Sequence, residues 1–140
     1  MSRNRISFIF EGSALAVISA DKELINIFMD IASGSEVVIA CRVSPKQKGD
    51  VVDFVKAKFP EKTTLAIGDG ANDVAMIMKA DVGVGIAGRE GMQAARTSDF
   101  AIGQFKFLKP LLFIHGREAY RRNSIVVCYS FYKNILYIMA

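Results

Sequence analysis

The 140-residue sequence contains few of the residues that most often build metal or disulfide sites. It has one histidine, His115, and two cysteines, Cys41 and Cys128, which are far apart and lack the spacing of metal ligands. We therefore expect two reduced, buried thiols and a surface or interface histidine with no metal role.

Other absences narrow the class of protein further. The N-terminus lacks the long apolar core of a signal peptide, and the chain has no repeat and no low-complexity tract. Basic residues are scattered apart from Arg117, Arg121 and Arg122, and aromatic residues do not interleave with them as in a single-strand-binding groove. We expect no nucleic-acid partner. The three arginines precede an apolar segment, which is typical of a cytosolic membrane flank.

Short apolar runs alternate with amphipathic helical patterns along the first hundred residues. This alternation predicts an α/β fold with a parallel sheet and right-handed crossovers. The runs predict strands near residues 6–10, 37–43, 64–67, 82–85 and 100–102, a loop at 11–13, and helices at about 21–32, 45–59, 71–79 and 90–96. Gly34 is expected to end the first of these helices as a C-terminal glycine.

Two carboxylates follow the apolar run at 64–67. Asp69 lies between Gly68 and Gly70, and Asp73 follows four residues later. The carboxyl end of a parallel strand is where α/β folds place their ligands, and the glycines allow a close approach of the backbone. A pair of carboxylates suits a hard cation such as Mg²⁺. The alternative is that Asn72 or Asp73 caps the next helix and the remaining acid is solvated.

A lysine at the start of the helix expected at 45–59 adds a second signal. Ser44 fits the N-cap, Pro45 the first helical position, and Gln47 can close a capping box. Lys48 then lies near a helix N-terminus, which is already positive, so a cation there is explained if it faces an anion. The alternative is a solvated surface lysine.

These motifs resemble the haloacid dehalogenase superfamily. Within it, residues 41–48 (Cys-Arg-Val-Ser-Pro-Lys-Gln-Lys) and 66–77 look like the phosphorylation domain of P-type ATPases. Segments 81–94, 98–105, 115–117 and 131–134 look like the type IV, phospholipid-translocating branch. The resemblance runs from about Phe8 to the end. It implies a three-layer, Rossmann-like parallel sheet of the haloacid dehalogenase type, incomplete because the strand carrying the nucleophile is absent.

The resemblance also assigns roles to residues. Asp69 and Asp73 would hold Mg²⁺, with Asp73 in a supporting position. Lys48 would neutralise phosphate charge, and Asn72 and the Gly70 backbone would help to place the phosphate. Arg42, Ser44 and Pro45 are assigned to structure.

The family's phosphorylated aspartate lies in an Asp-Lys-Thr-Gly-Thr motif, which this sequence lacks. Asp21-Lys22 is followed by Glu-Leu and fits a helix start better. We therefore expect residues 1–104 to be part of a phosphorylation domain that is inactive alone. Residues 105–140 would be a stalk helix and the truncated start of the fifth transmembrane helix, since the apolar stretch 125–140 falls short of the roughly 20 residues of a full span. The alternative is an amphipathic helix packed on the sheet.

The parent would be an ATP-driven phospholipid flippase with an aspartyl-phosphate intermediate. It would use Mg²⁺ and ATP and be an integral membrane protein, with this segment on the cytosolic face. Its partners would be the lipid and the membrane, with an accessory subunit possible. Two alternatives remain: a soluble phosphatase of the superfamily whose nucleophile lies upstream, and a non-catalytic regulatory module. An open sheet edge could also pair with a second copy.

Overall fold

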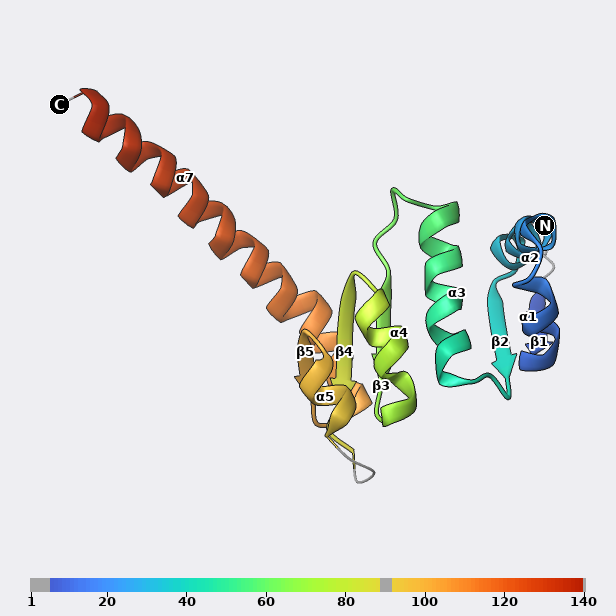
Figure 1. The fold of residues 1–140 in the computed structure, drawn as a ribbon. Coiled ribbons are helices and arrows are strands. Elements are labelled where there is room, and N and C mark those ends of the chain that lie inside the picture. Colours follow the sequence, from blue (N-terminus) through green and yellow to red (C-terminus); the bar gives the residue numbers. More distant parts are fainter. Residues whose placement is uncertain (1–5, 89–91, 140) are drawn as a thin grey trace, which may run out of the picture. The chain divides into compact units, whose positions relative to one another are not determined.

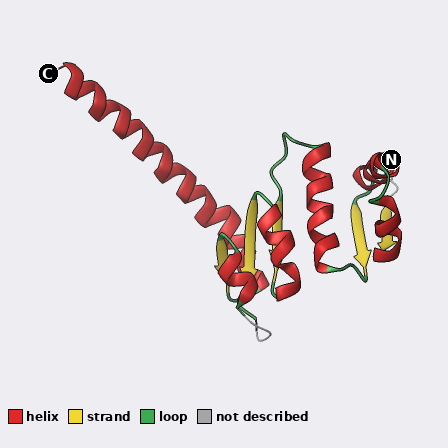
Figure 2. Ribbon diagram, viewed as in Figure 1, coloured by secondary structure: helices red, strands yellow, loops and turns green. Residues whose placement is uncertain are grey.

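The computed structural model describes residues 6–88 and 92–139. The chain divides into two compact units, Met1–Ile102 and Gly103–Ala140 (Figure 1). The first unit contains all the strands of the described residues, and the second is helical (Figure 2). An α/β fold with parallel strands confirms the expected fold class.

The first unit begins with a two-stranded parallel sheet. β1 (Ser7–Glu11) leads into α1 (Gly12–Ile18) and α2 (Lys22–Gly34), and β2 (Val37–Cys41) returns beside β1 with Ser7 opposite Val37. The core under this sheet consists of Phe10, Leu15, Phe28 and Met29, all less than a tenth exposed. The Phe10 and Phe28 rings meet edge to face with centroids 5.0 Å apart, a favourable aromatic geometry.

A second parallel sheet contains β3 (Leu65–Gly68), β4 (Val82–Ile86) and β5 (Phe100–Ile102) in that order. The 3₁₀ turn η1 (Ala71–Asp73) and α4 (Val74–Lys79) follow β3, and α5 (Gln93–Thr97) precedes β5. α5 approaches β4 closely because Gly85 has no side chain: a Cβ there would lie 2.5 Å from the Ala95 Cα.

α3 (Pro45–Lys58) connects β2 to β3 and packs against the first core through residues such as Val51, Phe54 and Val55. Its N-terminus has the predicted capping box. The Ser44 hydroxyl accepts a hydrogen bond from the Gln47 N–H at 3.3 Å, and the Gln47 side chain accepts one from the Ser44 N–H at 2.9 Å. This start of α3 fixes the place of Lys48.

The two sheets are separate in the described residues, because no strand pairs with both β2 and β3. We expected one incomplete sheet, and the structure instead has two smaller parallel sheets, one of two strands and one of three. The incompleteness was expected from the missing nucleophile strand.

Several local predictions were wrong. The segment 11–13 is not a loop, since α1 begins at Gly12. β2 ends at Cys41 because Arg42 adopts a φ of 51°, which strand geometry excludes. Gly34 is the last residue of α2, and its carboxyl neighbour Ser35 is extended, so no left-handed glycine ends the helix. Both cysteines are exposed. The first residues of the helix expected at 90–96 lie outside the described residues, and α5 begins at Gln93.

The second unit is a helical tail. A 3₁₀ turn η2 (Phe105–Phe107), α6 (Leu108–Pro110) and a π-helix η3 (Leu111–Gly116) lead into α7 (Arg117–Met139). None of the described side chains of α7 is buried within the unit. Over the described residues, no helix combines the length and the apolar character that crossing a membrane requires.

Candidate functional site

The carboxylate pair lies where β3 ends and the chain turns into η1. Gly68 is the last residue of β3 and is buried, and Asp73 is the last residue of η1. A Cβ on Gly68 would lie only 2.3 Å from the Asp73 Cβ, so the missing side chain lets Asp73 fold back onto the strand end. Gly70 differs: its φ of −121° is ordinary, and the nearest atom to an added Cβ is 3.9 Å away. The turn therefore requires glycine at 68 and not at 70.

Lys48 reaches this turn from α3. Its Nζ lies 2.7 Å from the Asp73 Oδ1, and the side chains are 31% and 13% exposed respectively. The pair is thus partly withdrawn from water, where a charge-assisted hydrogen bond is stronger than on an open surface. The contact joins residues 25 positions apart, and it places the predicted phosphate-binding lysine beside the predicted acidic strand end.

The second oxygen of Asp73 is also engaged. Asp73 Oδ2 accepts a hydrogen bond from the Asp69 N–H at 3.4 Å, a long contact. Asp73 occupies the N-cap position of α4 without forming a side-chain cap hydrogen bond, so helix capping does not explain it. With one oxygen on an ammonium and the other on a backbone amide, Asp73 orients the site more than it offers a free ligand.

Asp69 and Asn72 complete the set of predicted residues. Both are exposed, and Asp69 lies directly beyond the end of β3. Among the described residues no cluster of three or more His, Cys, Asp and Glu side chains could hold a metal. Mg²⁺ needs no such cluster, because it commonly keeps several waters and binds through one or two carboxylates. Asp69 fits a single carboxylate ligand of this kind.

Sequence reasoning missed a contact that ties the start of α3 to the first sheet. The Gln47 Nε2 donates to the Gly12 carbonyl at 2.6 Å while its Oε1 serves the capping box. Gln47, the residue that precedes Lys48, therefore ties the start of α3 to the β1–α1 junction. The hydrogen bond between Gln47 and the Ser44 N–H was predicted from the capping-box pattern. The hydrogen bond from Gln47 to the Gly12 carbonyl is seen only in the tertiary structure.

A network of ion pairs joins α3 to α4 and to the start of β4. Lys79 contacts both Asp53 and Asp50, and these hydrogen bonds, Asp53 first, raise the pKa of Lys79 above its ordinary value. Asp81 accepts from Lys56 at 2.7 Å and from the backbone and hydroxyl of Thr64, both at 2.8 Å. The Lys56 ammonium, followed by the Thr64 donors, holds the pKa of Asp81 far below its usual range.

Comparison with known proteins identifies the family. Residues 13–95 match the haloacid dehalogenase-like hydrolases, and residues 95–140 match the C-terminal region of phospholipid-translocating P-type ATPases. The first match begins within α1, ends within α5 and includes every predicted site residue.

Full-length relatives point to the same branch. The chain is 52% identical over 131 residues to phospholipid-transporting ATPase dnf1 of Schizosaccharomyces pombe, covering 94% of this chain and 8% of that protein. It is also 52% identical to phospholipid-transporting ATPase DRS2 of Saccharomyces cerevisiae, covering 94% of this chain and 10% of the relative. It is 51% identical to probable phospholipid-transporting ATPase 12 of Arabidopsis thaliana, and the match covers 94% of this chain and 11% of that protein.

The chain thus spans about a tenth of the length of these curated relatives. The chain belongs to the haloacid dehalogenase-like hydrolase family, and within it matches the phosphorylation and C-terminal region of phospholipid-transporting P-type ATPases.

Proposed function

We propose that this chain is part of the phosphoryl-transfer machinery of an ATP-driven phospholipid transporter. The observation that carries the proposal is the 2.7 Å contact between Lys48 and Asp73 at the carboxyl end of β3. A fixed ammonium beside a strand-end carboxylate is what phosphoryl transfer needs, because its catalysis is mainly positioning and charge stabilisation.

Lys48 binds the anionic phosphoryl oxygens in this proposal. An ammonium has three donors, and the Asp73 contact uses one, so further donors remain for a phosphate. Asp73 holds that ammonium in place through this hydrogen bond. The exposed Asn72 amide and the Gly70 N–H then contribute neutral donors to the same phosphoryl group.

Asp69 is the residue that would hold Mg²⁺, with Asp73 in support. The bound ion would neutralise phosphate charge and orient its oxygens. The exposed position of Asp69 leaves room for the waters that Mg²⁺ retains. ATP is the proposed phosphate source, and a phosphorylated aspartate outside this chain is the proposed acceptor.

The helical tail is proposed to be a stalk that leads into the membrane on its cytosolic side. From Ile125 onward, α7 presents large apolar side chains around its circumference, and a helical segment that is apolar all round requires an apolar environment. Ser130 lies within this apolar segment, and its hydroxyl donates a hydrogen bond to the Val126 carbonyl of the same helix at 2.8 Å. Such internal satisfaction lowers the cost of a polar group in hydrocarbon.

The proposal also includes partners. An accessory subunit and self-association through the unpaired edges of β2 and β3 are both compatible with the open sheets.

The 140-residue chain alone should show no ATPase or phosphatase activity, because it has no Asp-Lys-Thr-Gly-Thr nucleophile. Robust Mg²⁺-dependent turnover by the purified chain would contradict this proposal.

The decisive experiment uses the longer protein that contains this chain. Lys48→Ala and Asp69→Asn should each abolish phosphoenzyme formation from labelled ATP or stall its turnover. Lys46→Ala is the matched control, because Lys46 lies two residues away on the same helix and is exposed. Wild-type phosphoenzyme formation and turnover in Lys48→Ala or Asp69→Asn would refute the assigned roles, provided that the variants remain folded.

A further inference from the structure

Charge is distributed very unevenly between the two units. Residues 1–102 contain twelve lysines and arginines against thirteen aspartates and glutamates, whereas residues 103–140 contain six basic residues and one acid. The positive charge of the chain therefore resides in the helical tail. Five of its six basic residues precede Ser124, ahead of the apolar part of α7.

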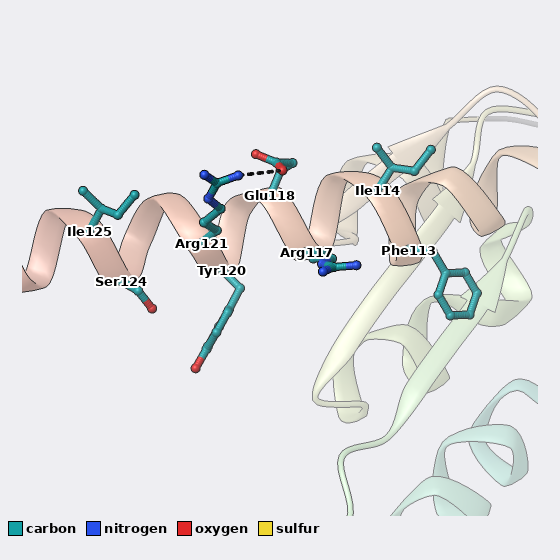
Figure 3. Close-up of a pocket in the computed structure, with 8 residues that line it drawn as sticks. All are labelled: Phe113, Ile114, Arg117, Glu118, Tyr120, Arg121, Ser124 and Ile125. Carbon is teal, nitrogen blue, oxygen red and sulfur yellow. Dashed lines mark ion pairs between the residues drawn. The ribbon is translucent and has the colours of Figure 1, made fainter.

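The centre of this charge is the arginine cluster, which we define as Arg117, Arg121 and Arg122 in the first turns of α7. Arg117 and Arg121 are four residues apart and so share a helix face. Glu118 is the one acid in the sequence of residues 103–140, and it lies 3.9 Å from Arg121, with side chains 50% and 73% exposed respectively (Figure 3). An exposed pair at this distance is weak, so Glu118 leaves most of the positive field in place.

Two members of the cluster, Arg117 and Arg121, border an open pocket of about 700 Å³ along the helix (Figure 3). Its polar lining consists of Arg117, Arg121, Tyr120, Ser124 and the acidic Glu118. Ile125 borders the same pocket at the start of the apolar segment. Anion-binding donors therefore stand directly beside an apolar surface.

This order of chemistry along one helix matches a lipid at the bilayer surface. A phospholipid presents an anionic headgroup above apolar chains, and α7 presents arginines followed by exposed side chains such as Val126, Phe131 and Ile138. Tyr120, 76% exposed, lies at the junction where amphipathic aromatic rings favour the membrane interface. We propose that the arginine cluster binds the anionic headgroups of bilayer phospholipids and so makes membrane engagement of α7 selective for anionic lipid.

This inference rests on the membrane placement of α7 proposed above. A nucleic acid would satisfy the arginines but would leave the apolar helix without a partner. A protein groove would cover one face of α7, whereas its large apolar side chains are exposed on all sides. A bilayer would offer anionic headgroups to the arginine cluster and an apolar interior to the rest of α7.

The test is sedimentation of the 140-residue chain with vesicles of phosphatidylcholine alone or with about 30% phosphatidylserine, at low and high salt. The replacement variant changes Arg117, Arg121 and Arg122 to Gln. The control changes Lys22, Lys46 and Arg96 to Gln, which removes the same charge from exposed positions of the first unit.

Wild-type chain and control should prefer the anionic vesicles, and salt should weaken that preference. The arginine variant should lose about 100-fold in partition to anionic vesicles, roughly fivefold for each charge removed, with little change on neutral vesicles.

Four results would overturn the inference. Equal binding of the wild-type chain to both kinds of vesicle would support the membrane placement of α7 but contradict its selectivity for anionic headgroups. No binding to either kind of vesicle would contradict the membrane placement as well. An equal loss in the control would assign the effect to net charge. Tight binding of a single-stranded oligonucleotide that displaces the vesicles would make the cluster a general polyanion site.

Discussion

Replacing Gly68 with alanine should disturb the site and the fold together. The added Cβ would lie 2.3 Å from the Asp73 Cβ and 2.6 Å from its Cγ. The first of these distances is more than about 1 Å shorter than an ordinary carbon–carbon contact. A rotation about χ1 moves the Asp73 Cγ and its oxygens but leaves the Cβ in place. The backbone of η1 must therefore shift away from β3.

That shift has two costs. Overpacking a buried position typically costs about 1–3 kcal/mol. Movement of Asp73 by about 1 Å would also stretch its contact with Lys48, which is 2.7 Å in the structure. We expect a loss of about 2 kcal/mol in the free energy of unfolding, or roughly 10 °C in the Tm of a unit of this size.

Gly34→Ala is the matched control, because no atom lies within 4 Å of its added Cβ. It should be neutral or stabilising by about 0.5 kcal/mol. The assay is thermal or urea unfolding followed by circular dichroism, combined with a double-mutant cycle between Gly68→Ala and Lys48→Met. If Gly68→Ala has broken the ion pair, Lys48→Met should cost less in that background than in the wild type. A Gly68→Ala variant as stable as Gly34→Ala, with additive effects in the cycle, would refute the reasoning.

Two further predictions concern the supports of the site. Asp81→Asn should remove part of the acid sensitivity of folding. The folded pKa of Asp81 is depressed, so its contribution is present above its ordinary value of 3.8 and is lost as the pH falls below it. Urea unfolding between pH 6 and about pH 2 checks this, and an unchanged pH profile in the variant would contradict it. Ser44→Ala should cost about 1 kcal/mol through loss of the α3 cap. Gln47→Ala should cost more, since its side chain also donates to the Gly12 carbonyl. A Gln47→Ala variant that is no less stable than Ser44→Ala would show that the Gly12 contact contributes nothing.

The sequence predicted the elements whose signals are local. The capping box at Ser44 depends on residues three apart, and both of its hydrogen bonds are present. Asp21 likewise caps α2 by accepting from the Glu23 N–H at 2.9 Å. α1 was missed because a Gly-Ser start is typical of a turn, whereas burial of Leu15 at 0% exposure favours a helix there.

Long-range contacts were predictable only in part. The βα order placed Lys48 near the acidic strand end, and the structure brings it there. The sequence could not say which carboxylate it would meet, since that depends on the backbone path allowed by Gly68. The contacts of Lys79 with Asp50 and Asp53 could not be predicted from the sequence, because they depend on how α3 packs against α4.

The choice of Asp73 as the partner of Lys48 separates the roles of the two acids. Asp73 has both oxygens engaged, whereas Asp69 has an exposed carboxylate. In the longer protein, Asp69→Asn should therefore lose phosphoenzyme formation at the Mg²⁺ concentration that suffices for the wild type, and excess Mg²⁺ should recover part of it. Asp73→Asn should lower the amount of phosphoenzyme with little change in the Mg²⁺ requirement, because the amide oxygen can still accept from Lys48 but carries no charge. Magnesium titrations of both variants distinguish these outcomes. An equal shift in Mg²⁺ requirement for Asp73→Asn would make Asp73 a direct ligand and would require Lys48 to release it.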